Sequence, residues 1–144
     1  MTAALYNTEI LRLTTAIPHD HRLVDPMASV EKRSPICGSR VTVDVNLDEQ
    51  DRVTEIGVLV RACALGQASA ALLSAHIVGR SVSELAVVRD TLTAWLAAGQ
   101  GEAPDWPGLD VLSPALSYTA RHPSIRLAFE AAAEAAASAA DRDR

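Results

Sequence analysis

The segment Arg40-Val41-Thr42-Val43-Asp44-Val45-Asn46-Leu47 decides the fold class of this chain. Its apolar residues all stand at odd positions, which is the period-two pattern of a β-strand with one buried face. The polar stretch 48–51 that follows predicts a turn, and residues 53–61 predict the return strand. Together the two strands are expected to form an antiparallel hairpin.

Two further features extend this sheet. Val53 is out of phase with the later apolar residues of the return strand, which indicates a bulge near Thr54 or Glu55. Upstream, residues 8–16 predict a short N-terminal helix, and a long connection follows it. A weak edge strand is expected within that connection, around 28–32.

The remainder of the chain has helical patterns. Residues 65–78 are apolar on nearly all sides, so they predict a buried helix. Ser81-Val-Ser-Glu84 is a capping box that opens a second helix. Ser113-Pro114 is expected to start a short helix with proline at its first position. The alanine-rich stretch 124–140 predicts the last helix.

These elements predict an α+β fold, in which a small antiparallel β-sheet packs against helices and the C-terminal half is helical. We expect a single domain over residues 1–144, with an N-terminal helix at 8–16, a sheet at about 28–61 and a helical part at 64–140. Apolar residues make up 49% of the chain and aromatic residues only 3%, so the core should be aliphatic.

The net charge and the hydropathy of the chain limit which partners and which cellular location are expected. The net charge is -5 and no basic stripe is visible, which argues against a nucleic-acid partner. Because no run of about 18 uninterrupted apolar residues occurs, no membrane span is expected. The N-terminal sequence does not have the pattern of a secretion signal, so the expected location is cytoplasmic. There the two cysteines should be reduced thiols.

Cys37, Cys63 and His122 are the candidate ligands, because each is expected at the end of an element. Cys37 precedes the strand 40–47, Cys63 lies between the return strand and the buried helix, and His122 precedes the last helix. Thiolates suit soft metal centres such as zinc and iron–sulfur clusters, and a helix N-terminus stabilises a thiolate. Gly38 would let the backbone approach a bound metal or sulfide.

Simpler interpretations of these residues stay open. A cysteine is often a small buried hydrophobe, and His122-Pro123 is also a common way to begin a helix. His76 falls on an apolar stripe and is interpreted as a core histidine, while the loop pair His19 and His21 is interpreted as solvated. The sequence has no nucleophile–base arrangement and no glycine-rich phosphate loop, so nothing supports a hydrolase or a kinase.

Three local motifs resemble those of the iron–sulfur cluster assembly scaffolds of the IscU/SufU/NifU N-terminal type. They are Pro-Ile-Cys37-Gly-Ser39, the segment 61–70 that contains Cys63, and Arg-His122-Pro123-Ser. Together with the order of elements, the resemblance covers about residues 5–138. Ser39 stands where the family has aspartate, and Pro123 stands where it has a third cysteine, so the matching ligand set is Cys37, Cys63 and His122.

The resemblance implies a SufE/NifU-like fold and a scaffold or carrier protein rather than an enzyme. Its cargo would be iron or a labile [2Fe–2S] cluster, with zinc as an alternative. The implied partners are a cysteine desulfurase and recipient apo-proteins, and the implied state is a monomer or weak homodimer. Two alternatives are a homologue without cluster chemistry that serves as an interaction module for a desulfurase, and a zinc-dependent sulfur-transfer accessory.

Overall fold

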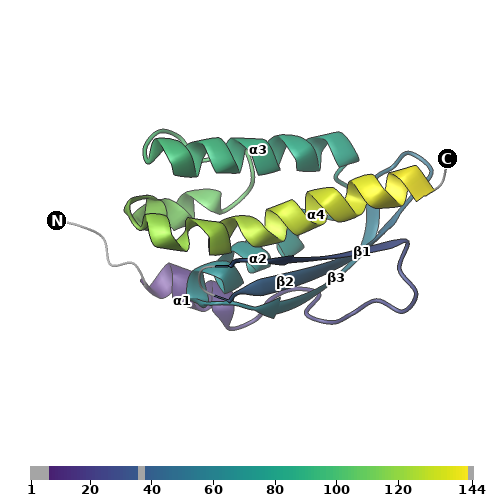
Figure 1. Cartoon of the computed structure of the whole chain (residues 1–144), viewed down its shortest axis with the longest axis horizontal. Helices are drawn as coiled ribbons and strands as arrows, with labels where there is room; N and C mark the ends of the chain where they lie inside the picture. Colours follow the sequence, from purple (N-terminus) through teal and green to yellow (C-terminus); the bar gives the residue numbers. More distant parts are fainter. Residues whose placement is uncertain (1–6, 36–37, 143–144) are drawn as a thin grey trace.

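The computed structural model describes residues 7–35 and 38–142, and it contains one small sheet with helices packed against it (Figure 1). Strands come first along the chain and helices dominate afterwards, so the predicted α+β fold class is confirmed. The elements, in chain order, are α1 (Thr8–Thr14), β1 (Ala28–Arg33), β2 (Arg40–Leu47), β3 (Val53–Arg61), α2 (Ala64–His76), α3 (Val82–Ala98), the 3₁₀ helices η1 (Leu109–Ser117) and η2 (Thr119–Arg121), and α4 (His122–Arg142).

The sheet has the strand order β1-β2-β3, and both pairs of neighbouring strands are antiparallel. Val41, Val43 and Val45 on the central strand β2 are each 0% exposed. The odd-numbered face of this strand is therefore the core face, as its alternating sequence predicts.

The bulge predicted in the return strand is also present. Asn46 pairs with Glu55, whereas the next residue of β2, Leu47, pairs with Val53. Thr54 is therefore an extra residue in β3, and it brings Val53 back to the buried face, where it is 1% exposed.

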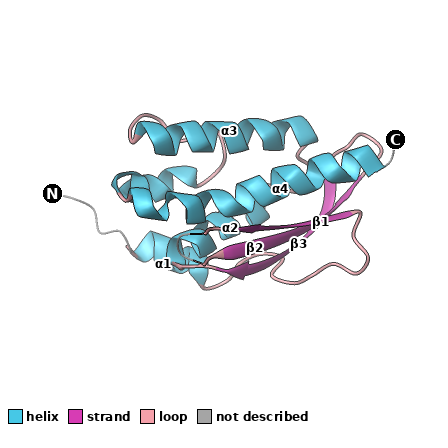
Figure 2. Cartoon of the chain, viewed as in Figure 1, coloured by secondary structure: helices cyan, strands magenta, loops and turns pink. Residues whose placement is uncertain are grey.

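The long helices α2, α3 and α4 lie on one side of the sheet (Figure 2), and α1 packs against α2. Helix α4 packs against β1 and β2, α2 packs beside it against β3, and α3 packs on the side of α4 that faces away from the sheet. Alanine makes this packing close, because small side chains let α4 approach its neighbours on several sides. The alanines of α4 that are fully buried are Ala128, Ala131, Ala132, Ala135, Ala136 and Ala139.

A loop covers part of the opposite, outer face of the sheet. Residues 15–27 run beneath the strands in Figure 1, from α1 to the start of β1. Gly57 of β3 lies directly against this loop, because a Cβ added there would collide with the carbonyl oxygen of His21 and lie 3.0 Å from the nitrogen of Leu23. The backbone of the loop therefore rests on the sheet where β3 has no side chain.

Several predicted helix bounds differ from the structure, and the buried helix expected at 65–78 spans Ala64–His76. The N-terminal helix ends at Thr14 instead of residue 16, and the last helix spans His122–Arg142 rather than 124–140. The short helix expected to begin at Ser113-Pro114 is instead η1, with Pro114 inside it. The reason is a three-residue spacing of buried side chains, because residues 109, 112 and 115 are each 0% exposed. A 3₁₀ helix brings residues i and i+3 to the same face.

The interpretation of His76 as a core histidine is wrong, because this side chain is exposed. Trp106 occupies the buried position instead and is 4% exposed. Its indole nitrogen donates a hydrogen bond to the carbonyl of Leu72 at 2.9 Å, and His76 contacts its ring edge to face. A tryptophan that is distant in sequence therefore displaces the histidine from the core.

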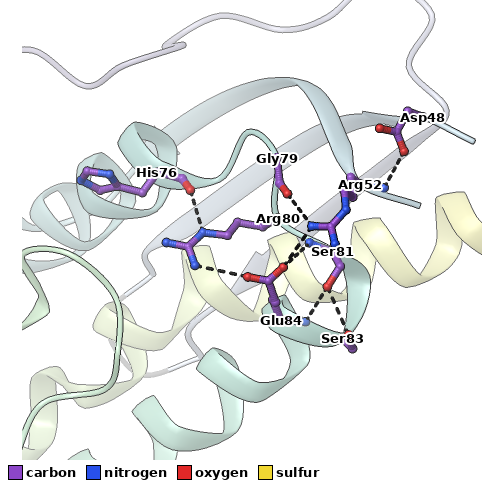
Figure 3. A network of polar contacts seen from close by, with 8 residues as sticks. All are labelled: Asp48, Arg52, His76, Gly79, Arg80, Ser81, Ser83 and Glu84. Atoms are coloured by element: carbon purple, nitrogen blue, oxygen red, sulfur yellow. Dashed lines mark hydrogen bonds and ion pairs between the residues drawn. The ribbon is translucent and has the colours of Figure 1, made fainter. Parts of the chain in front are cut away.

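A network of polar contacts fixes the end of the sheet where the hairpin turns (Figure 3). The Glu84 carboxylate accepts hydrogen bonds from Arg52 and Arg80, each at 3.3 Å, and from the Ser81 backbone at 3.2 Å. The bond from the Ser81 backbone, with the help of Arg80, holds the pKa of Glu84 below its ordinary value. The Ser81 hydroxyl in turn accepts from the Glu84 N–H at 3.1 Å, so the predicted capping box is present. This network joins the hairpin to the connection between α2 and α3.

Candidate functional site

The candidate site lies at the other end of the sheet, where β2 begins and β3 ends (left in Figure 1). Helix α2 starts there directly after β3, and the first turn of α4 packs against it. A Cβ added to Gly66 of α2 would lie 3.4 Å from the carbonyl oxygen of Ser124, and Ser69 donates a hydrogen bond to the carbonyl of Ile125 at 2.6 Å. The absence of a side chain at Gly66 therefore permits close contact between the two helices.

The start of β2 joins the same cluster through a pair of buried hydroxyl groups. The oxygens of Ser39 and Ser124 are 2.7 Å apart, and the two residues are 4% and 1% exposed. Ser39 follows Cys37 by two residues, and Ser124 follows His122 by two. The structure thus brings together the three segments that carry the predicted ligands: the residues after Cys37, the first turn after Cys63 and the first turn of α4.

Cys63 is the N-cap residue of α2. Its backbone is extended, with φ -65° and ψ 171°, and its carbonyl accepts the first helical hydrogen bond, from Gln67, at 2.9 Å. The side chain is half-buried and makes no capping hydrogen bond to any described residue. The thiol therefore stands at the N-terminal end of α2.

The prediction for Cys37 falls outside the described residues, but the residues on either side of 36–37 are described. Ser34 donates a backbone hydrogen bond to the carbonyl of Ser39 at 2.8 Å, and Gly38 donates one to the carbonyl of Ser34 at 3.1 Å. Gly38 has φ +73°, a conformation that glycine adopts without strain. These bonds hold together the ends of the connection between β1 and β2.

His122 is the first residue of α4, and it is 6% exposed. Its Nε2 atom lies 3.0 Å from the carbonyl oxygen of Ala115 in η1. Because a carbonyl only accepts, Nε2 must carry the proton of this bond, and a neutral ring then keeps its lone pair on Nδ1. Metal-binding histidines commonly donate their second N–H to such a carbonyl. The geometry suits both a helix start and a ligand through Nδ1.

The described residues alone do not form a complete metal site. Within 7–35 and 38–142, no group of three or more histidine, cysteine, aspartate or glutamate side chains lies close enough to hold a metal ion. Any site made of Cys37, Cys63 and His122 depends on a residue beyond those ranges. In the same ranges, no helix has the length and apolar character needed to cross a membrane.

A buried ion pair lies on the outer face of the sheet. The Asp44 side chain is 0% exposed and binds Arg22 through two hydrogen bonds, at 2.7 and 3.1 Å, and the backbone of Leu23 at 3.0 Å. Burial disfavours the carboxylate, but the hydrogen bonds from Arg22, Ser29 and Leu23, together with the Arg22 charge, outweigh it. They hold the pKa of Asp44 below its ordinary value.

The fold and this end of the sheet define a small α+β protein with one site region, and comparison with known proteins identifies its family. Residues 5–106 match the family described as the NifU-like N-terminal domain, so the chain belongs to that family. The match ends before α4, so it does not include His122. The family is one of scaffold proteins and not of enzymes, in agreement with the class that the resemblance implied.

Individual relatives agree with this assignment. The iron–sulfur cluster assembly scaffold protein IscU of Streptococcus pyogenes serotype M1 is 24% identical over 119 residues, which are 82% of this chain and 74% of that protein. The crystal structure of the N-terminal part of a nitrogen-fixing NifU-like protein from Brucella abortus has a TM-score of 0.87 and 32% identity, and the match covers 95% of both chains.

A third comparison concerns the fold alone. A crystal structure from Fervidobacterium islandicum AW-1, named as a candidate iron–sulfur cluster assembly scaffold for the SUF system, has a TM-score of 0.81 at 17% identity. The match covers 92% of this chain and 96% of that one. The fold therefore extends over α4 as well, beyond the residues that match the family.

Proposed function

We propose that this protein is an iron–sulfur cluster assembly scaffold or carrier, and that Cys37, Cys63 and His122 hold its cargo. The cargo is iron or a labile [2Fe–2S] cluster. The observation that carries the proposal is the contact between the Ser39 and Ser124 hydroxyls, because it joins the segments that contain Cys37 and His122 beside the start of α2. Membership of the NifU-like family supports the same chemistry.

The ligand set explains why the cargo would be labile. Clusters of this kind are ordinarily held by four thiolates, and this chain has two cysteines. His122 would add an imidazole through Nδ1, which is an accepted ligand for iron in such clusters. An outside thiol, or the same residues of a second protomer in a weak homodimer, would complete the set. A site with borrowed ligands releases its cargo readily, which suits a carrier.

The remaining parts of the proposal follow from the relatives. Sulfur would come from a cysteine desulfurase, and the assembled cluster would pass to recipient apo-proteins. Cluster assembly would take place in the cytoplasm. The named relatives are scaffold proteins for iron–sulfur cluster assembly, which supports these roles. Zinc at the same thiolates is the alternative cargo.

A second function is favoured by one observation. Proline stands at residue 123, where the family has a third cysteine, and the neighbouring His122 is 6% exposed and already bonded to Ala115. In this alternative the chain no longer binds a cluster and serves as an interaction module for the desulfurase.

Anaerobic reconstitution separates the two functions. Purified protein is mixed with ferric iron and sulfide, which supply a [2Fe–2S]²⁺ core without a further oxidant, and the bound iron, bound sulfide and visible spectrum are measured. We expect a chromophore in the natural protein and none in Cys37→Ala/Cys63→Ala. Equal iron and sulfide in the two proteins would contradict the scaffold function. Desulfurase binding retained by that variant would then favour the interaction module.

A further inference from the structure

Three arginines form a row across the sheet at the end that carries the candidate site. Arg33 of β1 is the register partner of Arg40 of β2, and Arg40 is the register partner of Arg61 of β3. Register partners present their side chains on the same face of a sheet. Because the next residue, Val41, points into the core, the three arginines lie on the outer face. We call them the arginine row.

Repulsion within the arginine row lowers the stability of the sheet, so a function of the row would explain its presence. Like charges directly opposite each other on neighbouring strands destabilise a sheet. Among the described residues, only Glu31 offsets this repulsion, with its carboxylate 3.4 Å from Arg33 and 3.9 Å from Arg40. No carboxylate of a described residue lies within ion-pair distance of Arg61. The row therefore carries more positive charge than its own carboxylate neutralises.

A groove runs along the outer face from the arginine row toward the ion pair of Arg22 and Asp44. It has a volume of about 440 Å³, and Arg40, Arg61, Glu31 and Arg22 supply its charged lining. Leu59, which is 38% exposed, adds an apolar side chain between the charges. The groove therefore offers the guanidinium groups of Arg40 and Arg61 beside an apolar side chain, whereas the Arg22 guanidinium is already bonded to Asp44.

We propose that this groove docks an acidic segment of a partner protein, with its carboxylates on the arginine row. Glu31 already shows carboxylate–guanidinium contacts within the row. Arg40 and Arg61 line the groove, and Arg33 continues the row outside its lining. Neighbouring strands lie about 4.8 Å apart, so the row spans roughly 10 Å and suits several carboxylates along an extended chain better than one phosphate. Long anionic surfaces such as nucleic acid or a membrane are disfavoured, because the whole protein carries a charge of -5.

The groove lies next to the segments that carry the proposed ligands, so docking there would place a partner close to them. Arg61 precedes Cys63 by two residues, and Arg33 and Arg40 flank the connection that contains Cys37. A partner bound through an acidic segment is thereby held beside the residues that receive or release the cargo. This role rests on the proposed function, whereas the docking itself does not.

Binding is tested with a fluorescently labelled heptapeptide that alternates glutamate with alanine or leucine, and with the same peptide carrying glutamine instead. Protein free of iron and sulfide is titrated by fluorescence anisotropy. We expect Arg40→Gln/Arg61→Gln to weaken binding of the acidic peptide at least tenfold, and the glutamine peptide to bind no protein. The matched control is Arg12→Gln/Arg89→Gln, which removes the same charge on α1 and α3 and should leave binding unchanged.

Several results would overturn the docking surface. Equal weakening in both double variants would mean that only the overall charge matters. Tighter binding of a DNA duplex, of phosphatidylglycerol vesicles or of inorganic phosphate through the same arginines would assign the groove to another ligand. A thermal melt confirms folding of both variants. If the natural protein binds the peptide but takes up no iron, the proposed function fails and the docking surface stands. If it takes up iron but does not bind the peptide, the docking surface fails and the proposed function stands.

Discussion

The hydroxyl of Ser124 lies 2.7 Å from the hydroxyl of Ser39, although 85 positions separate them in the sequence. One belongs to the first turn of α4 and the other directly precedes β2. Their contact connects the C-terminal helix to the end of the sheet where the candidate ligands are expected.

The serine pair should be energetically coupled. Ser39→Ala, Ser124→Ala and the double variant form a double-mutant cycle, and we expect an interaction free energy of about 0.5–1.5 kcal/mol, because the hydrogen bond is buried. The free energies of unfolding are measured by urea denaturation. Additive effects of the two substitutions would show that the contact contributes nothing to stability.

Gly66→Ala should destabilise the protein by about 1–3 kcal/mol, despite the higher helix propensity of alanine. The added Cβ would lie 2.6 Å from the Cβ of Ala62, so the connection between β3 and α2 would have to shift, and it would also touch the carbonyl oxygen of Ser124 at 3.4 Å. Urea denaturation gives the change, and Ala64→Gly serves as a control for helix propensity at the start of α2. A gain in stability with Gly66→Ala would mean that Ala62 does not lie against Gly66 as described.

Asp44→Asn should lower the free energy of unfolding at neutral pH by about 1–3 kcal/mol, because it removes a charged acceptor bonded to Arg22 and Leu23. The folded-state pKa of Asp44 lies below its value in the unfolded chain. Its contribution is therefore present above the unfolded value of about 3.9 and is lost as the pH falls through the folded value.

The measurement for Asp44 is the difference in stability between the natural protein and Asp44→Asn from pH 7 down to about pH 2. This difference should shrink below about pH 4. Glu84 also has a lowered pKa, but it is present in both proteins and so largely cancels from the difference. A difference that stays constant over the whole range would contradict the assigned ionisation.

His122→Ala should shorten the time for which reconstituted protein retains iron against a chelator, whereas His76→Ala should not. Both substitutions remove an imidazole, but His122 lies at the start of α4 and His76 is exposed near the end of α2. Nitrogen NMR of the metal-free protein tests the premise, because a neutral His122 bonded to Ala115 must carry its proton on Nε2. Equal iron loss in both variants would remove His122 from the ligand set.

The fold was predictable because its strongest signals are local. Burial of one face of β2 requires the alternation seen in 40–47, and the phase of Val53 already indicated a bulge near Thr54 or Glu55, which the structure places at Thr54. The capping box of α3 lies within the four residues 81–84. Such patterns depend on period and on neighbouring residues, so a single sequence is enough to recognise them.

The features that the sequence did not predict depend on contacts between distant segments. Alternation placed Asp44 on a solvent-facing side, but residues 19–23 bury it. The pairing of Ser39 with Ser124 and the arginine row both require the register of the strands and the position of α4. For the candidate site, the sequence located Cys63 and His122 at element ends, while the prediction for Cys37 lies outside the described residues.

The absence of a side chain at Gly57 of β3 affects the ionisation of Asp44 on the neighbouring strand β2. It is the register partner of Asp44, and the loop backbone at His21 and Leu23 rests on it. Any side chain at position 57 would lift that backbone and withdraw the Leu23 amide and Arg22 from the Asp44 carboxylate. The stability that Asp44 contributes near neutral pH therefore depends on a residue that carries no charge and has no side chain.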